Sequence, residues 1–406
     1  IGNLNRLVSL NLYSNQFTGS LPASLGGLSS LQSMALYSNQ FSGPLPSELG
    51  NLVNLRYLDL HSNQFSGDLP ASFGNLTALQ NLLLQVNDLS GPFPSEWGNM
   101  ANLEFLRLEE NQVSGSIPAS FGGLSNLANF TAGYNALSGP IPPELGNLSR
   151  LEVLDLRHNG LTGTIPVTFS GLAGIQVLYL QFNQLTGGVP PELGGLTTLT
   201  DLRLQSNLLT GEIPTTLSSL TNLHTLYIHL NQLSGSIPPA LGNLLNLRYL
   251  HLYSNRLTGT IPPELGALTQ LVDLSLNSNS LEGPIPAELG GLTQLQILTL
   301  NGNMLSGSIP TSLTNLTALA PATTNLGYNA LSASDPALVA FLNVKDPDWA
   351  ATQTVPPSQV TAAALDGAAI LLSWLPTVYT SDAGYYVISG SQTPGGPYSL
   401  IGQTAN

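Results

Sequence analysis

The sequence predicts a repeat solenoid, and two periodic observations support this prediction. An asparagine recurs every 24 residues without slippage, from Asn15 to Asn303. In all thirteen of these repeats a glycine follows four residues later and a proline seven residues later, as Gly19 and Pro22 do in the first repeat. A fixed period of about 20 to 50 residues is typical of stacked units that bury their apolar faces only against one another.

Each repeat contains a predicted strand. In the third repeat, Leu58 and Leu60 alternate with Tyr57, Asp59 and His61. This period of two indicates a strand with one buried face. Because the partner strand is the same segment of the neighbouring repeat, we expect a parallel sheet that grows by about 4.8 Å per repeat.

The recurring asparagines follow the strands and lie between apolar positions. We therefore expect their amides to be buried and to bond the backbone of the turn that leaves the strand. These residues, which we call the asparagine ladder, are interpreted as structural rather than ligand-binding. Replacing Asn159 by Leu is expected to lower the free energy of unfolding by about 1–3 kcal/mol.

A short helix is predicted after the turn. Residues 137–142 read Leu-Ser-Gly-Pro-Ile-Pro, where we expect the glycine to supply the turn conformation and Pro142 to fit the first helical turn. Two residues later stands Glu144, replaced in most other repeats by Ser or Thr, as at Thr168. Both types suit a helix N-terminus, by charge or as a cap. Gly146 is expected to end the helix.

Charge and cysteine content exclude several kinds of partner and site. The formal net charge is −14 and Lys345 is the single lysine, so we do not expect nucleic acid as a partner. The absence of cysteine excludes disulfides and thiolate metal sites. No apolar run reaches the roughly 18 residues that cross a bilayer, so no membrane span is expected within this sequence.

The consensus Leu-x-x-Leu-x-Leu-x-x-Asn-x-Leu-x-Gly-x-Ile-Pro resembles the leucine-rich repeat family, and specifically its plant-type 24-residue class, over about residues 1–331. The resemblance implies a curved superhelix with a concave parallel β-sheet, a second short strand in each repeat and short (3-10) helices on the convex side. Members of the family recognise peptides, glycans or other proteins, as receptor ectodomains or as inhibitors of enzymes that degrade the plant cell wall.

The solenoid is expected to span residues 1–334 with about 14 repeats. Residues 1–4 have the repeat phase of residues 49–52, so we expect the sequence to begin within a repeat. Asp335 and Pro336 predict the start of a capping helix in a segment that covers residues 335–351. Leu338, Phe341 and Leu342 lie on one face of this helix, and Trp349 is expected to pack under it.

The remaining sequence loses the 24-residue period. Residues 352–358 are expected to form an extended linker, and residues 359–406 show alternating strand patterns. Trp374 and the Tyr385-Tyr386-Val387 segment resemble the first half of a fibronectin type III domain, a β-sandwich that we expect to be incomplete here. The cap and this segment together resemble secreted bacterial leucine-rich repeat proteins.

Candidate binding residues lie six, four and two positions before each ladder asparagine, where we expect the side chains to face solvent. Tyr227, His229, Tyr249, His251 and Tyr253 fall on two adjacent strands and are expected to form one aromatic and imidazole patch. Tyr is a favoured interface anchor and its ring also stacks on sugars. The alternative interpretation is that these rings only stabilise an exposed sheet. Further candidates on the same face are Tyr37, His61, Tyr179 and Arg203.

A second, charged patch is predicted from Arg107 and Glu109 together with Asp155 and Arg157 two strands further on. Its alternative interpretation is mutual neutralisation. His229 and His251 have no third metal-ligating residue nearby in the pattern, so neither a metal nor another cofactor is expected. The sequence contains no nucleophile elbow and no phosphate-binding loop, so we do not expect an enzyme.

These features predict a non-enzymatic recognition protein, secreted or at the cell surface, that binds a protein, peptide or glycan on the concave face. One alternative is a receptor-type ectodomain or an inhibitor of cell-wall hydrolases. Another is a passive structural spacer or adhesin stalk. The pattern leaves the oligomeric state open. Glycosylation sequons, which matter only in a host that glycosylates, occur at Asn75, Asn129, Asn147 and Asn315.

Overall fold

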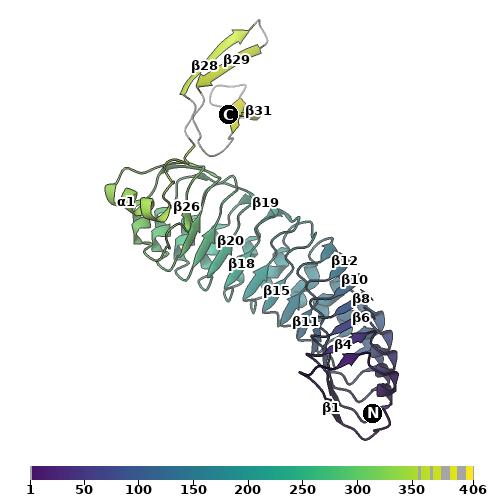
Figure 1. Ribbon diagram of the computed structural model, residues 1–406. Coiled ribbons are helices and arrows are strands. Elements are labelled where there is room, and N and C mark those ends of the chain that lie inside the picture. Colours follow the sequence, from purple (N-terminus) through teal and green to yellow (C-terminus); the bar gives the residue numbers. More distant parts are fainter. Residues whose placement is uncertain (1, 355–357, 366–368, 376–384, 391–398, 406) are drawn as a thin grey trace.

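The computed structural model describes residues 2–354 and, beyond them, the backbone of residues 358–365, 369–375, 385–390 and 399–405. The repeats stack into an elongated, curved and twisted solenoid (Figure 1). A parallel sheet forms the concave side and short 3-10 helices form the convex side. The predicted fold class is confirmed for this part of the chain.

The concave sheet contains one strand from each repeat, and each pairs in parallel with its neighbours in the adjacent repeats. Partner residues are 24 apart, as in Tyr227 opposite His251, so the sheet has no register shift over most of its length. Within the described residues its 14 strands are, in spatial order, β1 (Ser9–Asn11), β3 (Ser33–Ala35), β5 (Tyr57–Asp59), β7 (Asn81–Leu83), β9 (Phe105–Arg107), β11 (Asn129–Thr131), β13 (Val153–Asp155), β15 (Val177–Tyr179), β16 (Asp201–Arg203), β18 (Thr225–Tyr227), β20 (Tyr249–His251), β22 (Asp273–Ser275), β24 (Ile297–Thr299) and β26 (Thr324–Asn325).

The asparagine ladder joins consecutive repeats through backbone groups. Asn159 Nδ2 donates to the carbonyls of Leu156 and Arg157 in its own repeat and of Ala132 in the preceding one, at 3.0–3.1 Å. Its Oδ1 accepts from the backbone N–H of Leu137 at 2.9 Å. The amide therefore closes its own turn and holds the previous one. Most ladder residues are half-buried rather than buried, because one edge of the turn meets solvent.

A second series of short strands follows the ladder. Here the motif glycines have a positive φ, for example +74° at Gly139, which confirms their predicted role in the turn. One set of paired strands is β2 (Thr18–Gly19), β4 (Gln40–Gly43), β6 (Gln64–Asp68), β8 (Asp88–Pro92), β10 (Gln112–Gly115), β12 (Ala136–Pro140) and β14 (Gly160–Thr162). The others are β17 (Thr210–Glu212), β19 (Gln232–Ser236) and β21 (Arg256–Thr258), then β23 (Glu282–Gly283), β25 (Met304–Ser308) and β27 (Ala330–Ser332).

The convex helices differ in detail from the expectation. Pro142 is the extended residue that precedes η6, not part of its first turn. Thr168 does not cap η7; its hydroxyl donates to the Pro143 carbonyl of the preceding helix at 2.6 Å and links the two repeats. The helices in the described residues are η1 (Ala23–Gly27), η2 (Ser47–Asn51), η3 (Ala71–Asn75), η4 (Ser95–Asn99), η5 (Ala119–Gly123), η6 (Pro143–Asn147), η7 (Val167–Gly171), η8 (Pro191–Gly195), η9 (Thr215–Ser219), η10 (Pro239–Asn243), η11 (Pro263–Ala267), η12 (Ala287–Gly291) and η13 (Thr311–Asn315).

In most of the convex helices a glycine just before the last residue permits close packing instead of ending the helix. Gly146 lies inside η6, which continues to Asn147. A Cβ atom added at Gly146 would stand 2.2 Å from the Thr168 carbonyl oxygen of the next repeat. The expected role of this residue as a helix stop was therefore wrong. The glycine is needed because successive convex helices approach each other at this position.

The C-terminal end of the solenoid is closed by α1 (Pro336–Lys345). Asp335 caps this helix, accepting from the N–H groups of Ala337 and Leu338. As the sequence pattern indicates, Leu338 and Leu342 are buried against the last repeat and Trp349 is buried with them.

Gln353 extends the ladder beyond the predicted cap. Its Nε2 donates to the Leu326 carbonyl at 3.1 Å and its Oε1 accepts from the Leu331 N–H at 2.9 Å. These partners lie 27 and 22 residues earlier, as they do for a ladder asparagine. Residues 352–354, which the sequence places in the linker, therefore belong to the solenoid.

Two antiparallel strand pairs follow in the described backbone. β28 (Ser358–Leu365) pairs with β29 (Ala369–Leu375), and β30 (Tyr385–Gly390) pairs with β31 (Ser399–Ala405). The linker residues 355–357 lie outside the described residues. The fibronectin type III resemblance of residues 359–406 stays a prediction. No helix within the described residues is long and apolar enough to cross a membrane.

Candidate functional site

Four of the candidate binding residues lie opposite one another on consecutive strands at the centre of the concave sheet. Tyr179 on β15 lies opposite Arg203 on β16, Arg203 lies opposite Tyr227 on β18, and Tyr227 lies opposite His251 on β20. We call these residues the central row. All four occupy the position four residues before a ladder asparagine, so the parallel register of the strands brings their side chains together.

The side chains of the central row contact one another through their flat faces. The Arg203 guanidinium carbon lies 4.7 Å from the ring centroid of Tyr179 and 5.3 Å from that of Tyr227. The rings of Tyr227 and His251 stack with centroids 4.1 Å apart. The result is a continuous cation–π and π-stacked series over four strands.

Two aspartates that were absent from the predicted set hold the row in place. Asp201 accepts two hydrogen bonds from Arg203, at 2.8 and 3.0 Å, and one from the Tyr179 hydroxyl at 3.1 Å. Asp273 Oδ2 lies 2.9 Å from His251 Nε2, a close contact without hydrogen-bond geometry. Arg203 is thus neutralised within its own strand, which leaves a polarised but not strongly charged surface.

The two tyrosines of the central row have raised pKa values, so their hydroxyl groups stay protonated. Burial raises the pKa of Tyr227 to about 12, and burial together with the Asp201 charge raises that of Tyr179 to about 12. The hydrogen bond to Asp201 raises the pKa of Arg203. Around neutral pH, therefore, the row contains two neutral phenols and one guanidinium that stays charged, and the Tyr179 hydroxyl already donates to Asp201.

The predicted aromatic and imidazole patch is assembled in the structure. His229 stacks on Tyr253 with centroids 4.1 Å apart, and Tyr249 meets Tyr227 edge to face at 6.5 Å. The His229 and His251 centroids are 5.5 Å apart. Burial, followed by the neighbouring His251, lowers the pKa of His229 to about 3, so this imidazole is neutral around pH 7.

Unpartnered polar atoms lie beside the central row. Gln181, Gln205 and His229 occupy the position two residues before a ladder asparagine on three consecutive strand–turn units, and they are 3%, 7% and 7% exposed. Their Oε1, Oε1 and Nδ1 atoms are buried without a hydrogen-bond partner. Buried polar atoms of this kind are rare, because each loses its bonds to water without replacement.

The residues of the predicted charged patch form two separate ion pairs. Arg107 pairs with Glu109, whose other oxygen accepts from the Thr131 hydroxyl at 2.6 Å. Arg157 Nε lies 3.2 Å from Asp155 Oδ2, without hydrogen-bond geometry. Each arginine is thus balanced by a carboxylate two residues away on its own chain segment. The geometry agrees with the mutual neutralisation that we considered as the alternative.

Tyr37 and His61 do not join the central row. They stack with Tyr13 at the N-terminal end of the sheet, with centroid distances of 4.7 and 4.6 Å. Strands β7 to β13 separate this stack from the central row. It is a separate aromatic surface, built from Tyr and His like the aromatic and imidazole patch.

One exposed aromatic group was missed by the sequence analysis. Tyr134, His158 and Phe182 directly precede ladder asparagines, have φ values of 55°, 51° and 56°, and stack at 4.2 and 4.1 Å. We call these three residues the aromatic column. Its signal in the sequence is the change of residue type, because six of the thirteen repeats have Ser in this position, such as Ser62 and Ser254.

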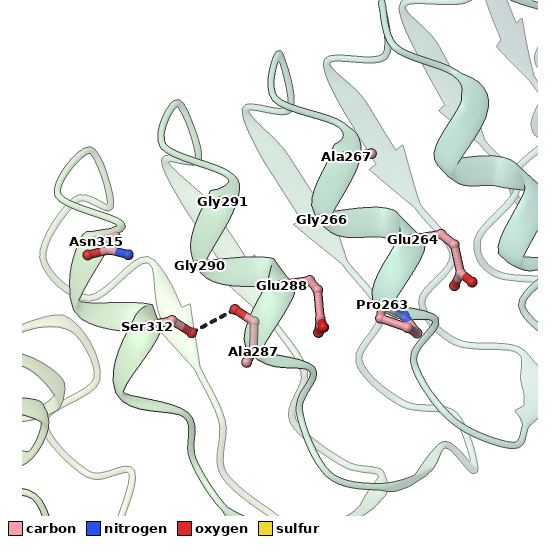
Figure 2. Close-up of a pocket in the computed structure, with 10 residues that line it drawn as sticks. All are labelled: Pro263, Glu264, Gly266, Ala267, Ala287, Glu288, Gly290, Gly291, Ser312 and Asn315. Carbon is pink, nitrogen blue, oxygen red and sulfur yellow. Dashed lines mark hydrogen bonds between the residues drawn. The ribbon is translucent and has the colours of Figure 1, made fainter.

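The convex side carries a shallow groove of about 520 Å³ across η11, η12 and η13 (Figure 2). Its lining includes three glycines and two alanines. Glu264 and Glu288 extend from successive helices, and the Ser312 hydroxyl donates to the Ala287 carbonyl at 2.6 Å. This set provides no converging reactive groups. Among the described residues, no three metal-ligating side chains come close enough to hold an ion.

Three of the four sequons lie on the same convex side as this groove. Asn75, Asn147 and Asn315 are exposed at the ends of their helices. Asn129, in contrast, is half-buried on the concave strand β11. The first three are therefore the more accessible positions for a glycan, and none of them touches the central row.

Comparison with known sequence families gives one consistent result. The family model described as "Leucine Rich Repeat" matches nine segments, and a related model, "Leucine rich repeat", matches residues 141–185. The nine segments are residues 6–28, 30–52, 54–76, 102–124, 198–220, 222–244, 246–268, 270–292 and 294–316. Among curated protein sequences no match is found.

Several solved structures are similar to this chain. The LRR ectodomain of the plant membrane receptor kinase GASSHO1/SCHENGEN3 from Arabidopsis thaliana, in complex with CASPARIAN STRIP INTEGRITY FACTOR 2, is 35% identical with a TM-score of 0.72. The LRR ectodomain of the Arabidopsis receptor kinase HAESA, in complex with an extended IDA peptide hormone ligand, is 35% identical with a TM-score of 0.79. An LRR protein of Leptospira interrogans is 32% identical with a TM-score of 0.65.

The similar regions cover most of this chain but different shares of the others. The matches to GASSHO1/SCHENGEN3 and HAESA cover 84% and 83% of this chain, yet the chain spans only 44% and 56% of those two ectodomains. The match to the Leptospira protein covers 85% of this chain and 90% of that one.

Proposed function

The chain belongs to the leucine-rich repeat family, and from this premise we propose that it is a non-enzymatic, extracellular recognition protein that binds a peptide, or an exposed segment of a protein, on its concave face. Binding centres on the central row and on the rings of His229, Tyr249 and Tyr253 beside it. The partner is held by contact with aromatic faces and by hydrogen bonds, not by net charge.

The observation that carries this proposal is the clustering of Tyr, Arg and His on three consecutive strands. Tyr227, His251 and Arg203 are half-buried, so each ring or guanidinium is already fixed by its neighbours and retains an exposed edge. Preorganised anchors lose little conformational entropy on binding. Tyr and Arg are also the residue types that most often dominate binding energy in interfaces.

The similar structures support a peptide more than a glycan. HAESA is described in complex with a peptide hormone ligand, and RGFR1, 34% identical over 85% of this chain, is described as a plant peptide hormone receptor in complex with RGF2. Peptide binding is carried over from these proteins as part of the proposal. A long, open sheet surface also accommodates an extended peptide better than a deep pocket does.

The test uses a library of phage-displayed random peptides as the probe, selected on the intact chain. Replacing Tyr227, His251 and Tyr253 together by Ala is expected to reduce capture of the selected peptides at least tenfold, with little change in the melting temperature. The matched control replaces Tyr13, Tyr37 and His61 by Ala, because it removes the same residue types from a stack elsewhere on the same face.

Two results would contradict the proposal. If the library yields no peptide that binds the concave face, the passive spacer becomes the better account. If both triple variants lose capture equally, binding is not centred on the residues around Tyr227. A sugar array tested on the same preparations shows whether a glycan takes the place of the peptide.

A further inference from the structure

The aromatic column ends at Phe182, and the next repeat has a small residue in the same position. Tyr134, His158 and Phe182 stack in consecutive repeats, the next repeat has Ser206, and the one after that has Leu230. Phe182 and Leu230 are 42% and 45% exposed. The gap between them is therefore bordered by two large apolar side chains that are open to solvent.

The backbone continues without change through this gap. The N–H groups of Phe182, Ser206 and Leu230 each donate to the next repeat, to the carbonyls of Gln205, His229 and Tyr253, at 3.0–3.1 Å. The φ values at Ser206 and Leu230 are 55° and 53°, close to the 56° of Phe182. Only the side chain differs, so Ser206 leaves the outer face of Phe182 without a ring stacked on it.

The size of the gap matches one planar ring. Phe182 and Leu230 are two repeats apart, which corresponds to about 9.6 Å at the spacing of β-strands. Rings in the existing column stack at 4.1–4.2 Å, so a ring placed midway would contact both neighbours. The face of Phe182 that points away from His158 would receive it in the offset or parallel arrangement that aromatic pairs favour.

Polar groups suited to a peptide backbone lie next to the gap. Gln205 directly precedes Ser206, and it is followed along the sheet by His229 and preceded by Gln181. The unpartnered atoms of these three side chains are two amide oxygens, which accept, and one imidazole nitrogen, which accepts when the ring proton is on Nε2. A peptide backbone supplies N–H donors in a regular series. A sugar hydroxyl both donates and accepts, so a sugar would also need donors from the protein.

We propose that the space above Ser206, between Phe182 and Leu230, is a socket for an aromatic side chain of the bound peptide. The inserted ring continues the stack of Tyr134, His158 and Phe182, and the N–H groups of the peptide bond Gln181, Gln205 and His229. This inference rests on the proposed function and adds a fixed anchor residue to it. The socket sets where along the sheet the peptide lies.

The test fills the socket from the protein side. Ser206→Phe places a ring in the gap at a φ that Phe182 already adopts, so the variant is expected to fold. The matched control is Ser254→Phe, which adds the same ring one repeat beyond Leu230, at a φ of 51°, and leaves the gap open. The probes are N-acetyl-phenylalaninamide, N-acetyl-leucinamide and a methyl glucoside, measured by saturation-transfer NMR together with the selected peptides.

We expect the aromatic amide to bind the unmodified chain and Ser254→Phe, and its ring signal to fall at least fivefold in Ser206→Phe. Selected peptides should carry an aromatic residue at one fixed position and lose binding at least tenfold in Ser206→Phe alone. Equal binding of the aromatic amide to all three proteins overturns the socket. If the glucoside is preferred, the site takes a sugar instead.

These results separate the socket from the proposed function. Peptides that bind the concave face and are indifferent to Ser206→Phe would contradict the socket and leave the proposed function intact. An aromatic amide that binds only when the socket is open, in a chain that selects no peptides, would support the socket and contradict the proposed function.

Discussion

The asparagine ladder and the central row each take one residue from consecutive repeats, 24 residues apart, yet the residue type is constant in the ladder and changes from each repeat to the next in the row. Asn159, Asn183 and Asn207 bond backbone atoms, which are the same in every repeat, so one side chain serves throughout. Tyr179, Arg203 and Tyr227 instead contact the side chains of their neighbours. Their identity can therefore change whenever the neighbouring residue changes with it.

This difference separates stability from recognition. A repeat that loses its asparagine leaves backbone groups of two repeats without partners, which lowers the stability of the fold. A repeat that changes its residue in the central row loses a contact on a half-exposed surface, which costs little. For this reason the residues on the concave face can differ from repeat to repeat and determine which ligand is bound, without loss of the fold.

The largest effect is expected from breaking the ladder. Asn159→Leu removes three bonds donated to carbonyls and one accepted from the Leu137 N–H, and we expect it to lower the free energy of unfolding by about 1–3 kcal/mol. The control is Asn301→Leu, which changes the same residue type on the concave face. Urea unfolding measures both, and equal losses would mean that the ladder has no special structural role.

The cap provides an intermediate test, because a carboxylate there bonds the backbone as a ladder amide does. Asp346 is 3% exposed and accepts from the Leu326 N–H at 2.7 Å, and burial raises its pKa to about 6. The folded state therefore holds this proton more tightly than the unfolded state, and stability is lost as the pH rises from about 4 to about 6.

Asp346→Asn keeps an acceptor for Leu326 and stays neutral at every pH. We expect it to melt at a higher temperature than the unmodified chain at pH 7, with the difference vanishing near pH 4. Asp335→Asn serves as the control, because asparagine caps a helix as well as aspartate does. A difference between Asp346→Asn and the unmodified chain that is constant from pH 4 to 7 would contradict the raised pKa.

The smallest effect is expected within the central row. Arg203→Ala removes the two hydrogen bonds to Asp201 and the contacts with Tyr179 and Tyr227, but the side chain is 30% exposed. We expect a loss of about 1 kcal/mol or less, reduced further by salt. Arg256→Ala, which removes an exposed contact to Gln232, should change stability less still. A loss as large as that of Asn159→Leu would remove the distinction between the two regions.

The regular features of the fold could be predicted because they follow from one period. Strand pairs such as Tyr227 opposite His251 require only that equivalent residues meet, and Asp335 with Pro336 marks the cap helix by local chemistry. The roles of Thr168 and Gly146 were misassigned, because their reasons lie in the neighbouring repeat and not in their own helix.

The candidate site could be predicted in part. The period placed Tyr227, His229, Tyr249, His251 and Tyr253 on one surface, and they do contact one another. The aspartates that hold the row were missed because their partners depend on side-chain reach, including a diagonal contact from Asp273 to His251. The aromatic column was missed because its direction depends on a positive φ, which the strand pattern does not show. Gln353 could have been found by counting 24 residues from Asn329.

The central claim, that the ladder holds the fold and the concave residues hold the ligand, is tested most directly by measuring melting temperature and peptide capture on the same preparations of two variants. The account predicts that Asn159→Leu melts at a markedly lower temperature but captures selected peptides normally when assayed well below that temperature. It predicts the reverse for the Tyr227, His251 and Tyr253 triple alanine variant. Loss of both properties in both variants, or capture retained by the triple variant, would contradict the claim.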